Sequence, residues 1–443
     1  MNEEKNSVYK LEGKPKFSVA FPLGMQHVLA MFVGNIAPII IICNVLGLPP
    51  EQKAFMIQAG MLVSGLVTLI QLYPVSRVGA GLPLVMGTSF AFVSTAIGVG
   101  KAYGLPGILG ASLIGSIAEI GMGFFLKPLR KFFPPIVTGT VLVAIGLKLI
   151  PVGINYFAGG VGAKDFGSPK NLLLGFLVLL IIIVLQQYAK GIMKLASLLV
   201  AIIIGYIVAI PMGLVDFSNV AAAGWISFPT PLKYGIEFHF DAILKFAAVY
   251  LVVGLETLGN ISGITMSGLG REATDDEMSG AVVADGVGSA FAALFSVLPN
   301  TGYGQNAGII ALTGVVNKYS VATGAGFLIL AGFVPKLGAI CAAIPNPVLG
   351  GAVLMVFGMI TISGIRMIMK TGLDQRNASI LAIALSLGLG FSQVPSSLEF
   401  MPSVLHQFFG DAVVASGILA LIFNIIFPKE KNTIKKEEKS EMA

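Results

Sequence analysis

A carboxyl group occurs near the middle of a long apolar stretch, where a charge is unexpected. Glu256 lies in the run VYLVVGLETLGNISGIT, 11 residues after Lys245 and 15 residues before Arg271. A charged side chain at that depth in a membrane is costly and usually functional. A carboxylate there can accept hydrogen bonds from the N–H groups of a ligand, or it can carry a proton. Glu256 is therefore our first candidate for a binding residue, with a paired structural acid as the alternative.

Two further acids and one histidine lie in apolar stretches. Asp285, in GAVVADGVGSA, is nearer the start of its predicted helix, so that a structural role and a proton-carrying role both stay open. Glu119, in ASLIGSIAEIGMG, has no partner that the sequence identifies, and we interpret it as structural or as lying near an interface. His27 follows Gln26 in PLGMQHVLAMF. A lone histidine on an apolar helix is usually a buried, satisfied group, but the paired polar residue also allows a site role.

Two similar segments, LPLVMGTSF at 82–90 and LPNTGYGQN at 298–306, are unlike ordinary membrane helices. Each begins with Leu-Pro, continues with residues such as Gly, Thr, Ser or Asn, and precedes an apolar run too short to span a membrane. We expect an extended strand to mid-membrane, followed by a half-helix. Irregular backbone at that depth is tolerated only where it is buried or lines a cavity. The alternative is a pair of external loops rich in Gly and Pro.

The ends of these segments carry side chains that suit a flat, neutral ligand. Gln305 and Asn306 begin the second half-helix, and a Gln amide presents a donor and an acceptor in one plane, as the edge of a planar amide heterocycle does. A helix start adds free N–H groups. Ser89 and Phe90 occupy the corresponding turn of the first segment, where the ring could stack on a ligand. An inorganic anion would instead require basic residues.

The composition predicts an all-α polytopic membrane protein. The chain has 443 residues, of which 55% are hydrophobic and 11% charged, whereas soluble domains are about 25% charged. The mean hydropathy of +0.88 leaves no room for a large soluble domain. The uncharged blocks are 17–50, 54–76, 78–100, 171–189, 195–215, 319–335, 337–365 and 377–398. Each is near or beyond the roughly 20 residues that cross a bilayer core, and the first is too long for a cleaved signal peptide.

The remaining composition excludes several functional classes. Cys43 and Cys341 both lie in apolar stretches, where we expect small buried side chains, and we find no metal motif, cofactor motif or disulfide framework. The pI near 9.1 could suggest nucleic acid as a partner. Basic loops beside membrane helices explain the positive charge better.

The basic residues predict the orientation in the membrane. When the apolar blocks are threaded through a bilayer, one side collects 20 of the 28 Lys and Arg residues. These are Lys5, Lys10, Lys14, Lys16, Arg77, Lys127, Arg130, Lys131, Lys190, Lys194, Arg271, Lys318, Arg366, Lys370, Arg376, Lys429, Lys431, Lys435, Lys436 and Lys439. By the positive-inside rule this side and both termini are cytoplasmic. The number of crossings is then even, and hydropathy leaves twelve or fourteen open.

The chain also repeats itself. The segment PIVTGTVLVAIG at 135–146 matches PVLGGAVLMVFG at 347–358 at five of twelve positions. The two Leu-Pro segments form a second pair with a similar offset, 216 residues against 212. Two pairs of similar segments that occur in the same order predict a duplicated unit. If each unit has an odd number of helices, the second copy is inverted in the membrane relative to the first. Seven plus seven segments satisfy both the repeat and the cytoplasmic termini, and inverted repeats are typical of secondary transporters.

Motifs along the whole chain resemble those of the nucleobase–ascorbate transporter family (nucleobase:cation symporter-2). The segment QNAGIIALTG is similar to the family signature, in which Gln or Glu is followed by Asn, any residue, Gly, four residues, Thr, and Arg, Lys or Gly. The motifs that carry the resemblance are QHVLAMF at 26–32, GTSFAF at 87–92, FPPIVTGTV at 133–141, LETLGN at 255–260, ADG at 284–286, QNAGIIALTG at 305–314 and NPVLGGAV at 346–353.

The resemblance implies fourteen transmembrane segments as two inverted repeats of seven, with the broken segments third and tenth. It implies a core domain and a gate domain that move against each other like an elevator. The implied parts are an N-terminal cytoplasmic tail (1–16), core (17–132), gate (133–240), core (241–343), gate (344–428) and a C-terminal cytoplasmic tail (429–443). Family members are proton or sodium symporters and generally homodimers. For this chain a plasma membrane location follows, and a bacterial inner membrane fits best.

Matching positions imply roles for individual residues. Glu256 and Gln305 would bind the base, and the ring and backbone of Phe90 would complete the pocket. The residues that would support geometry and coupling are His27, Asp285 and Asn306. Bacterial purine members favour Gln where this chain has Gln305, whereas uracil members favour Glu. The resemblance therefore favours xanthine or uric acid as the substrate, and a proton as the coupling ion.

One position departs from the family pattern. Four residues after Glu256, purine members typically have Asp and uracil members His, but this chain has Asn260, which cannot titrate. Helical spacing places Asn260 one turn from Glu256, so that a proton route through this position is in doubt. For proton coupling we therefore favour Asp285, with Glu256 as the alternative, because protonation would neutralise a charge that is costly to move across a membrane.

Three alternatives stay open at this point. The first is a transporter of the same family for uracil or another nucleobase. Its coupling ion could be sodium. The second is an anion transporter or channel of similar architecture, which should lack an acid at position 256 and carry a basic residue near the half-helices. The third is an intramembrane enzyme, which would need a nucleophile–base pair or a metal cluster that the sequence does not contain. We therefore do not expect an enzyme.

Overall fold

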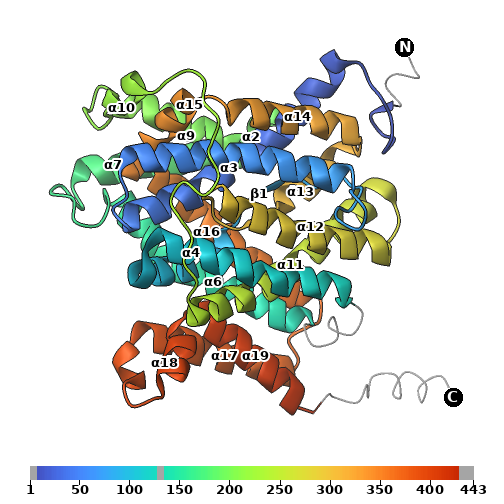
Figure 1. Ribbon diagram of the computed structural model, residues 1–443, viewed down its shortest axis with the longest axis vertical. Helices are drawn as coiled ribbons and strands as arrows, with labels where there is room; N and C mark the ends of the chain where they lie inside the picture. Colours follow the sequence, from blue (N-terminus) through green and yellow to red (C-terminus); the bar gives the residue numbers. More distant parts are fainter. Residues whose placement is uncertain (1–6, 127–133, 429–443) are drawn as a thin grey trace. The chain divides into compact units, whose positions relative to one another are not determined.

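The computed structural model describes residues 7–126 and 134–428, and nearly all of their regular structure is helical (Figure 1). The first half of the chain contains α2 (Phe17–Val45), α3 (Pro50–Leu72), β1 (Met86–Thr88), η1 (Phe90–Phe92), α4 (Val93–Phe124), α6 (Pro135–Phe157), α7 (Pro169–Tyr188), α8 (Ile192–Leu195), α9 (Ser197–Ala209) and α10 (Ser218–Ala222). The second half contains α11 (Phe240–Ile264), the π-helical turn η2 (Thr265–Leu269), α12 (Asp275–Leu294), β2 (Asn300–Gly302), α13 (Gly304–Thr313), α14 (Lys318–Ala331), α15 (Pro335–Ala342), α16 (Asn346–Met369), α17 (Gln375–Gln393), η3 (Pro395–Leu398), α18 (Ser403–Gly410) and α19 (Ala412–Ile426).

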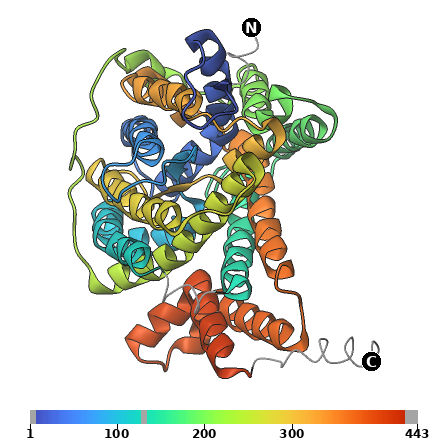
Figure 2. The same cartoon turned by 90° about the vertical axis from the view of Figure 1, so that its right-hand side faces the viewer.

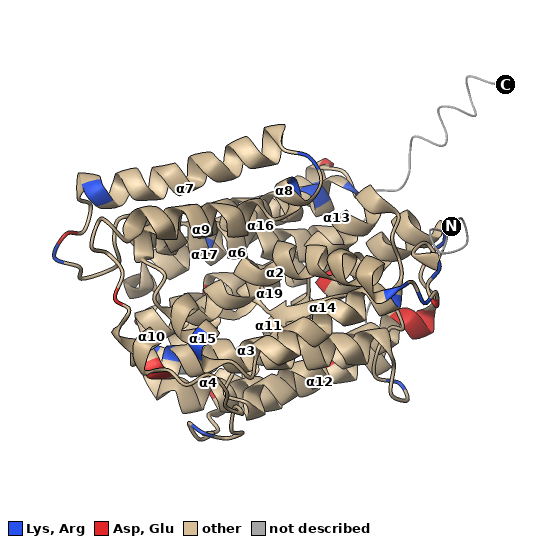
Figure 3. Cartoon of the chain, turned by 90° about the horizontal axis from the view of Figure 1, so that it is seen from above, with Lys and Arg blue, Asp and Glu red and all other residues tan. Residues whose placement is uncertain are grey.

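Several of these helices are long and apolar enough to cross a membrane. Within the described residues there are seven such helices, and an eighth span if α14 and α15, which meet at 86°, are counted as one broken span. Lys, Arg, Asp and Glu lie mainly at helix ends and in loops, while most of the helical ribbon carries no charge (Figure 3). The protein is therefore a multi-pass membrane protein, as the composition predicts. The total of fourteen segments and the inverted repeat stay predictions.

Parts of the predicted orientation fall on residues outside the described ranges. These parts are the first six residues of the N-terminal tail, the C-terminal tail 429–443, and the loop positions Lys127, Arg130 and Lys131. The described part of the N-terminal tail contacts the start of α14. There Asn317 Nδ2 donates to the carbonyl oxygens of Lys10, at 3.0 Å, and Gly13, at 2.6 Å.

Contacts divide the chain into two compact units, which are described separately. Unit 1 comprises residues 1–126 and 149–359, and unit 2 comprises residues 127–148 and 360–443. The helices α6 and α16 therefore each contribute to both units. The predicted core and gate boundaries follow a different division and stay a prediction.

Unit 1 contains the two segments that the sequence predicts to be broken. Strands β1 and β2 pair in antiparallel register, with Met86 opposite Gly302 and Thr88 opposite Asn300. A helix starts immediately after each strand, with η1 and α4 following β1 and α13 following β2. The predicted extended strand with a following helix is therefore present at both sites. Helices α2, α3, α11 and α12 contact the strand pair, which lies inside the unit (Figures 1 and 2).

Helix α4 consists of two helical pieces joined at a kink. Gly104 has φ 67° and ψ −169°, a conformation that glycine adopts without strain, and Pro106 follows in the second piece. The first piece, from Val93 to the kink, is too short to span a membrane alone, as predicted for a half-helix. The second piece carries Glu119 and packs along α11 and α12.

The helices of unit 1 begin at recognisable caps and cross at glycines. At the start of α12, Thr274 and Glu277 form a reciprocal capping box, which satisfies backbone N–H groups that have no partner within the helix. Helices α2 and α14 approach so closely that an ideal Cβ on Gly24 would lie 2.2 Å from Ser320 O, and one on Gly324 would lie 2.6 Å from Gly24 O. Small residues permit such backbone contact in membrane proteins.

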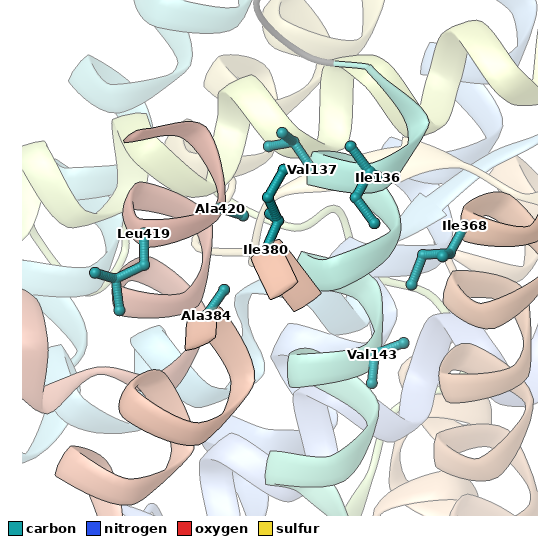
Figure 4. Close-up of a cluster of buried hydrophobic side chains, with 8 residues drawn as sticks. All are labelled: Ile136, Val137, Val143, Ile368, Ile380, Ala384, Leu419 and Ala420. Atoms are coloured by element: carbon teal, nitrogen blue, oxygen red, sulfur yellow. The ribbon is translucent and has the colours of Figure 1, made fainter. Parts of the chain in front are cut away.

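Unit 2 is held together by an apolar cluster, in which residues of α6 and α16 pack with α17 and α19 (Figure 4). Its buried members are Ile136, Val137, Val143, Ile368, Ile380, Ala384, Leu419 and Ala420. Gly139 makes the approach of α6 and α16 possible, because a Cβ there would lie 2.7 Å from Gly364 O. Gly351, its counterpart in the sequence repeat, lies in unit 1 and permits a similar close approach, because an ideal Cβ on Gly351 would lie 2.6 Å from Gly175 O.

Candidate functional site

Glu256 lies on α11, the helix that contacts η1, β2 and α13. Its side chain is half-buried, and no hydrogen bond from a described residue to its carboxylate is found. Glu256 is close enough to Tyr303, directly after β2, and to Asp285 of α12 to interact electrostatically with both. The carboxylate therefore lies beside the strand pair, and its oxygens can accept hydrogen bonds from a ligand because no described residue donates to them.

Gln305 lies in the first turn of α13, and its side chain is exposed in the isolated chain. No described residue hydrogen-bonds to its amide group. The start of α13 packs against the stretch of α11 that follows Glu256, since an ideal Cβ on Gly304 would lie 2.9 Å from Asn260 Oδ1 and one on Gly263 would lie 3.6 Å from Ala307 Cβ. The structure thus brings α11 and the first turn of α13 together, as the proposed pairing of Glu256 with Gln305 requires.

Asn260 connects these two elements. Its Nδ2 atom donates to the carbonyl oxygen of Gly302 at 2.9 Å, at the end of β2. A carboxylate could not make this bond, because it only accepts hydrogen bonds. In this chain Asn260 therefore acts as a tether between α11 and the turn into α13. The structure assigns it no part in moving a proton.

Ser89 and Phe90 form the turn between β1 and its helix. The backbone N–H of Ser89 donates to Pro299 O at 2.9 Å, and its hydroxyl accepts from Ala91 N at 3.3 Å, which caps η1. The Phe90 ring is nearly buried and meets the ring of Phe357 edge-on, with 5.7 Å between centroids. Ser89 therefore helps to fix the turn, while Phe90 offers an aromatic surface close to α11, and their roles in substrate binding stay predictions.

His27 and Asn306 lie together, away from solvent. Asn306 Nδ2 is 2.9 Å from His27 Nδ1, which links α13 to α2. Both side chains are buried, and Asn306 Oδ1 has no hydrogen-bond partner among the described residues. We predicted Asn306 to be a substrate ligand and His27 to be a supporting residue. The contact links the first turn of α13, and with it Gln305, to α2, and the predicted roles of both residues stay predictions.

Asp285 is fully buried on α12 and faces both α11 and β2. Its Oδ2 atom accepts a short hydrogen bond from Thr257 Oγ1 and a weaker one, at 3.5 Å, from Thr301 Oγ1. Its Oδ1 atom has no partner among the described residues. Glu256 of α11 is also close enough to Asp285 to interact with it electrostatically.

Three residues that position the strands were not singled out by the sequence analysis. Asn35 Oδ1 accepts hydrogen bonds from Thr88 N at 2.8 Å and from Ser64 Oγ at 2.9 Å, which fixes β1 to α2 and α3. The hydroxyl of Tyr303 donates to Thr88 O at 2.6 Å and links the two strand segments. An amide inside the apolar run of α2 was an available signal for Asn35, but its partners lie on other elements.

The comparisons with known proteins agree with the motifs. The Permease family matches residues 19–397. A relative from Clostridium perfringens is 40% identical over 436 residues, which cover 98% of this chain and 96% of that protein. The xanthine permease XanP of Escherichia coli is 36% identical over 440 residues, covering 96% and 95%.

A solved structure shares the fold. The murine Solute Carrier 26 family member A9 anion transporter, in its inward-facing state, aligns with a TM-score of 0.62 at 12% sequence identity, covering 94% of this chain and 70% of that one. At this identity the likeness concerns the fold alone. The family match and the sequence relatives extend over nearly the whole chain, and the chain therefore belongs to this permease family, the nucleobase–ascorbate transporter family (nucleobase:cation symporter-2).

Proposed function

We propose that the protein is a secondary active transporter that imports a purine nucleobase, xanthine and/or uric acid, by proton symport. The observation that carries the proposal is the Glu256 carboxylate, which lies on the helix beside the strand pair and accepts no hydrogen bond from the described residues. Polar groups that the protein shields from water are normally paired with a hydrogen-bond partner. A ligand with N–H groups would pair this one.

The neighbouring groups suit the edge of an oxidised purine. Glu256 accepts from two ring N–H groups, while the Gln305 amide both donates and accepts, which matches a ring carbonyl next to a ring N–H. The Phe90 ring can lie against the face of the base. The name of the Escherichia coli relative, a xanthine permease, supports the same substrate class.

The shared fold with an anion transporter does not make an anion the preferred substrate. An anion site would place basic side chains or free N–H groups where Glu256 lies, and a carboxylate there repels an anion. The acid at position 256 therefore favours a neutral substrate that donates hydrogen bonds. The enzyme alternative has no support either, because the family consists of permeases.

The same proposal extends to architecture and orientation. It includes fourteen segments in two inverted repeats, a core moving against a gate in an elevator-like way, a homodimer, and both termini in the cytoplasm of a bacterial cell. The antiparallel strands, each followed by a helix, support the inverted repeat, because an inverted duplication places equivalent strands in opposite directions. The paired close crossings at Gly139 and Gly351 support it as well.

A transporter of uracil or another nucleobase is the alternative, since Glu256 would serve any base with adjacent N–H groups, and sodium is the alternative coupling ion. Uptake by cells that express the protein distinguishes these substrates. Labelled xanthine, urate and uracil are offered separately, with each unlabelled base as competitor. We expect xanthine or urate to accumulate and to compete with each other. Accumulation of uracil alone would replace the purine proposal by the uracil alternative.

A further inference from the structure

The residue Glu119, which the proposed function does not use, lies beside Asp285. Glu119 is fully buried on α4, and neither of its carboxyl oxygens has a hydrogen-bond partner among the described residues. Its Oε1 atom lies 3.4 Å from the ideal Cβ position of Gly254 on α11. Thr257, three residues later on the same face of α11, donates to Asp285. Both acids therefore contact the same face of α11, at positions about one turn apart along that helix.

Contacts between α4 and α12 bring the acids closer still. An ideal Cβ on Gly286, directly after Asp285, would lie 3.1 Å from Ser116 O and 3.0 Å from Ile120 N, which flank Glu119 in the sequence. The carboxyl group of Glu119 is within hydrogen-bonding reach of that of Asp285. Neither can donate while both are ionised, because a carboxylate only accepts.

A single proton, bound by one of the two carboxyl groups, supplies the hydrogen-bond donor that the pair lacks. Two ionised carboxylates side by side in a buried site repel each other, so that one of them holds a proton. Asp285 already receives two hydroxyl donors on Oδ2 and is thereby suited to be the anion. A protonated Glu119 would donate to Asp285 Oδ1. That one bond gives partners to Asp285 Oδ1 and to one Glu119 oxygen, both of which otherwise lack them.

Among the described residues, no cationic side chain is found to act on the two acids. The titratable groups that act on the two acids from neighbouring helices are Glu256 and Tyr250, both on α11. The Tyr250 hydroxyl lies 2.9 Å from Ser112 Oγ on α4. Within the described chain no Lys, Arg or His contacts Glu119 or Asp285. The nearest negative charge is therefore that of Glu256 itself.

We propose that Glu119 and Asp285 together form the proton-binding site of the transporter, one shared proton being held between their carboxyl oxygens behind the substrate residue Glu256. The inference rests on the proposed proton symport. The proton comes from water on one side, forms an O–H bond with one carboxyl oxygen, and returns to water on the other side. A proton on the pair removes one negative charge near Glu256 and favours its ionised form. Ionised Glu256 accepts the N–H groups of the base, so that proton and substrate bind cooperatively, as linkage requires.

The first test is spectroscopic and independent of any substrate. Purified protein in lipid bilayers is studied by infrared difference spectroscopy while the pH is raised from neutral. The wild-type protein should show the carbonyl band of a protonated carboxylic acid, which disappears on deprotonation. Glu119→Gln should lack the band, whereas Glu256→Gln and the surface control Glu272→Gln should retain it. Absence of the band from the wild-type protein, or its retention in Glu119→Gln, overturns the proposal. A band that appears only after sodium is removed overturns it in favour of a sodium site.

The second test uses proteoliposomes and labelled xanthine. A membrane potential of about 100 mV acting on one proton supplies about 2.3 kcal/mol, which supports a concentration ratio of roughly 50-fold for the wild-type protein. Gln has the shape and neutrality of protonated Glu, so Glu119→Gln should still exchange labelled for unlabelled xanthine but should lose the 50-fold accumulation. Protonophore-sensitive accumulation by Glu119→Gln would refute the shared site. If the wild-type protein does not exchange xanthine, the proposed substrate fails, while the infrared test still decides the carboxyl pair.

Discussion

The replacement Glu256→Gln tests the substrate residue with little risk to the fold. Because no described residue hydrogen-bonds to the Glu256 carboxylate, the isosteric amide breaks no hydrogen bond within the described chain. Its effect should therefore appear on the ligand. One of the two acceptor oxygens becomes an N–H donor, which then faces an N–H group of the base.

The size of the effect follows from the hydrogen bonds involved. A hydrogen bond to a charged group contributes about 1.5–3 kcal/mol, which corresponds to about 10- to 150-fold in affinity. We expect the dissociation constant for xanthine to rise by at least the lower factor and high-affinity uptake to disappear. The amount of protein in the membrane and its melting temperature should not change.

The assay is equilibrium binding of labelled xanthine to the purified protein, followed by uptake in cells with matched expression. Glu272→Gln is the matched control, since it makes the same chemical change at an exposed loop residue. The control should bind and transport as the wild-type protein does. A Glu256→Gln protein with wild-type affinity and uptake would remove Glu256 from the site and with it the observation that carries the proposed function.

Three further predictions concern the second substrate residue, coupling and packing. Gln305→Glu should weaken purine binding by about 5- to 150-fold, because a carboxylate cannot donate a hydrogen bond and an unpaired polar group costs roughly 1–3 kcal/mol. The variant should also admit uracil. An unchanged substrate profile in competition assays would show that residue 305 does not contact the base. Asp285→Asn should lose uphill accumulation and keep exchange of bound substrate, and a variant that still concentrates substrate would transfer the coupling role to Glu256. Gly324→Ala should lower the melting temperature in detergent, since its Cβ would lie 2.6 Å from Gly24 O and overpacking costs typically about 1–3 kcal/mol. Gly326→Ala on the same helix, where no atom lies within 4 Å of an added Cβ, is the control, and equal melting temperatures for the two variants would contradict the packing argument.

The broken segments could be predicted because their cause is local. Pro and Gly in LPLVMGTSF and LPNTGYGQN disfavour a continuous helix, and both segments form a strand followed by a helix. The pairing of the two strands and its register depend on residues far apart in the sequence, such as Asn35 with Thr88. Local patterns contain no information on such contacts.

The candidate site was predictable where a residue's chemistry is rare in its surroundings. An acid in an apolar helix, as at Glu256, is noticeable in any sequence. That Glu119 and Asp285 are neighbours could not be predicted, because Asp285 lies on another helix much later in the chain. Asn306 was assigned to the ligand from its place beside Gln305, but successive residues on a helix point in different directions, and the structure turns Asn306 toward His27.

The number of membrane segments is the part that hydropathy cannot determine. Helices such as α9 (13 residues) and α13 (10 residues) are shorter than a bilayer core requires. In the proposed arrangement of fourteen segments they would complete their path with non-helical backbone or with a neighbouring helix, for which α14 and α15, joined at an 86° bend, are a candidate. A criterion based on helix length therefore finds fewer spans than a transporter with broken helices contains.

The most direct test of the central claim is the uptake of labelled xanthine by proteoliposomes that contain only this protein. We predict accumulation of xanthine against its gradient when the external medium is made more acidic, with no sodium present, and complete loss of accumulation when a protonophore is added. Uptake that requires a sodium gradient and ignores the protonophore would contradict the proton symport. No uptake or exchange of xanthine or urate under either gradient would contradict the assignment of a purine substrate.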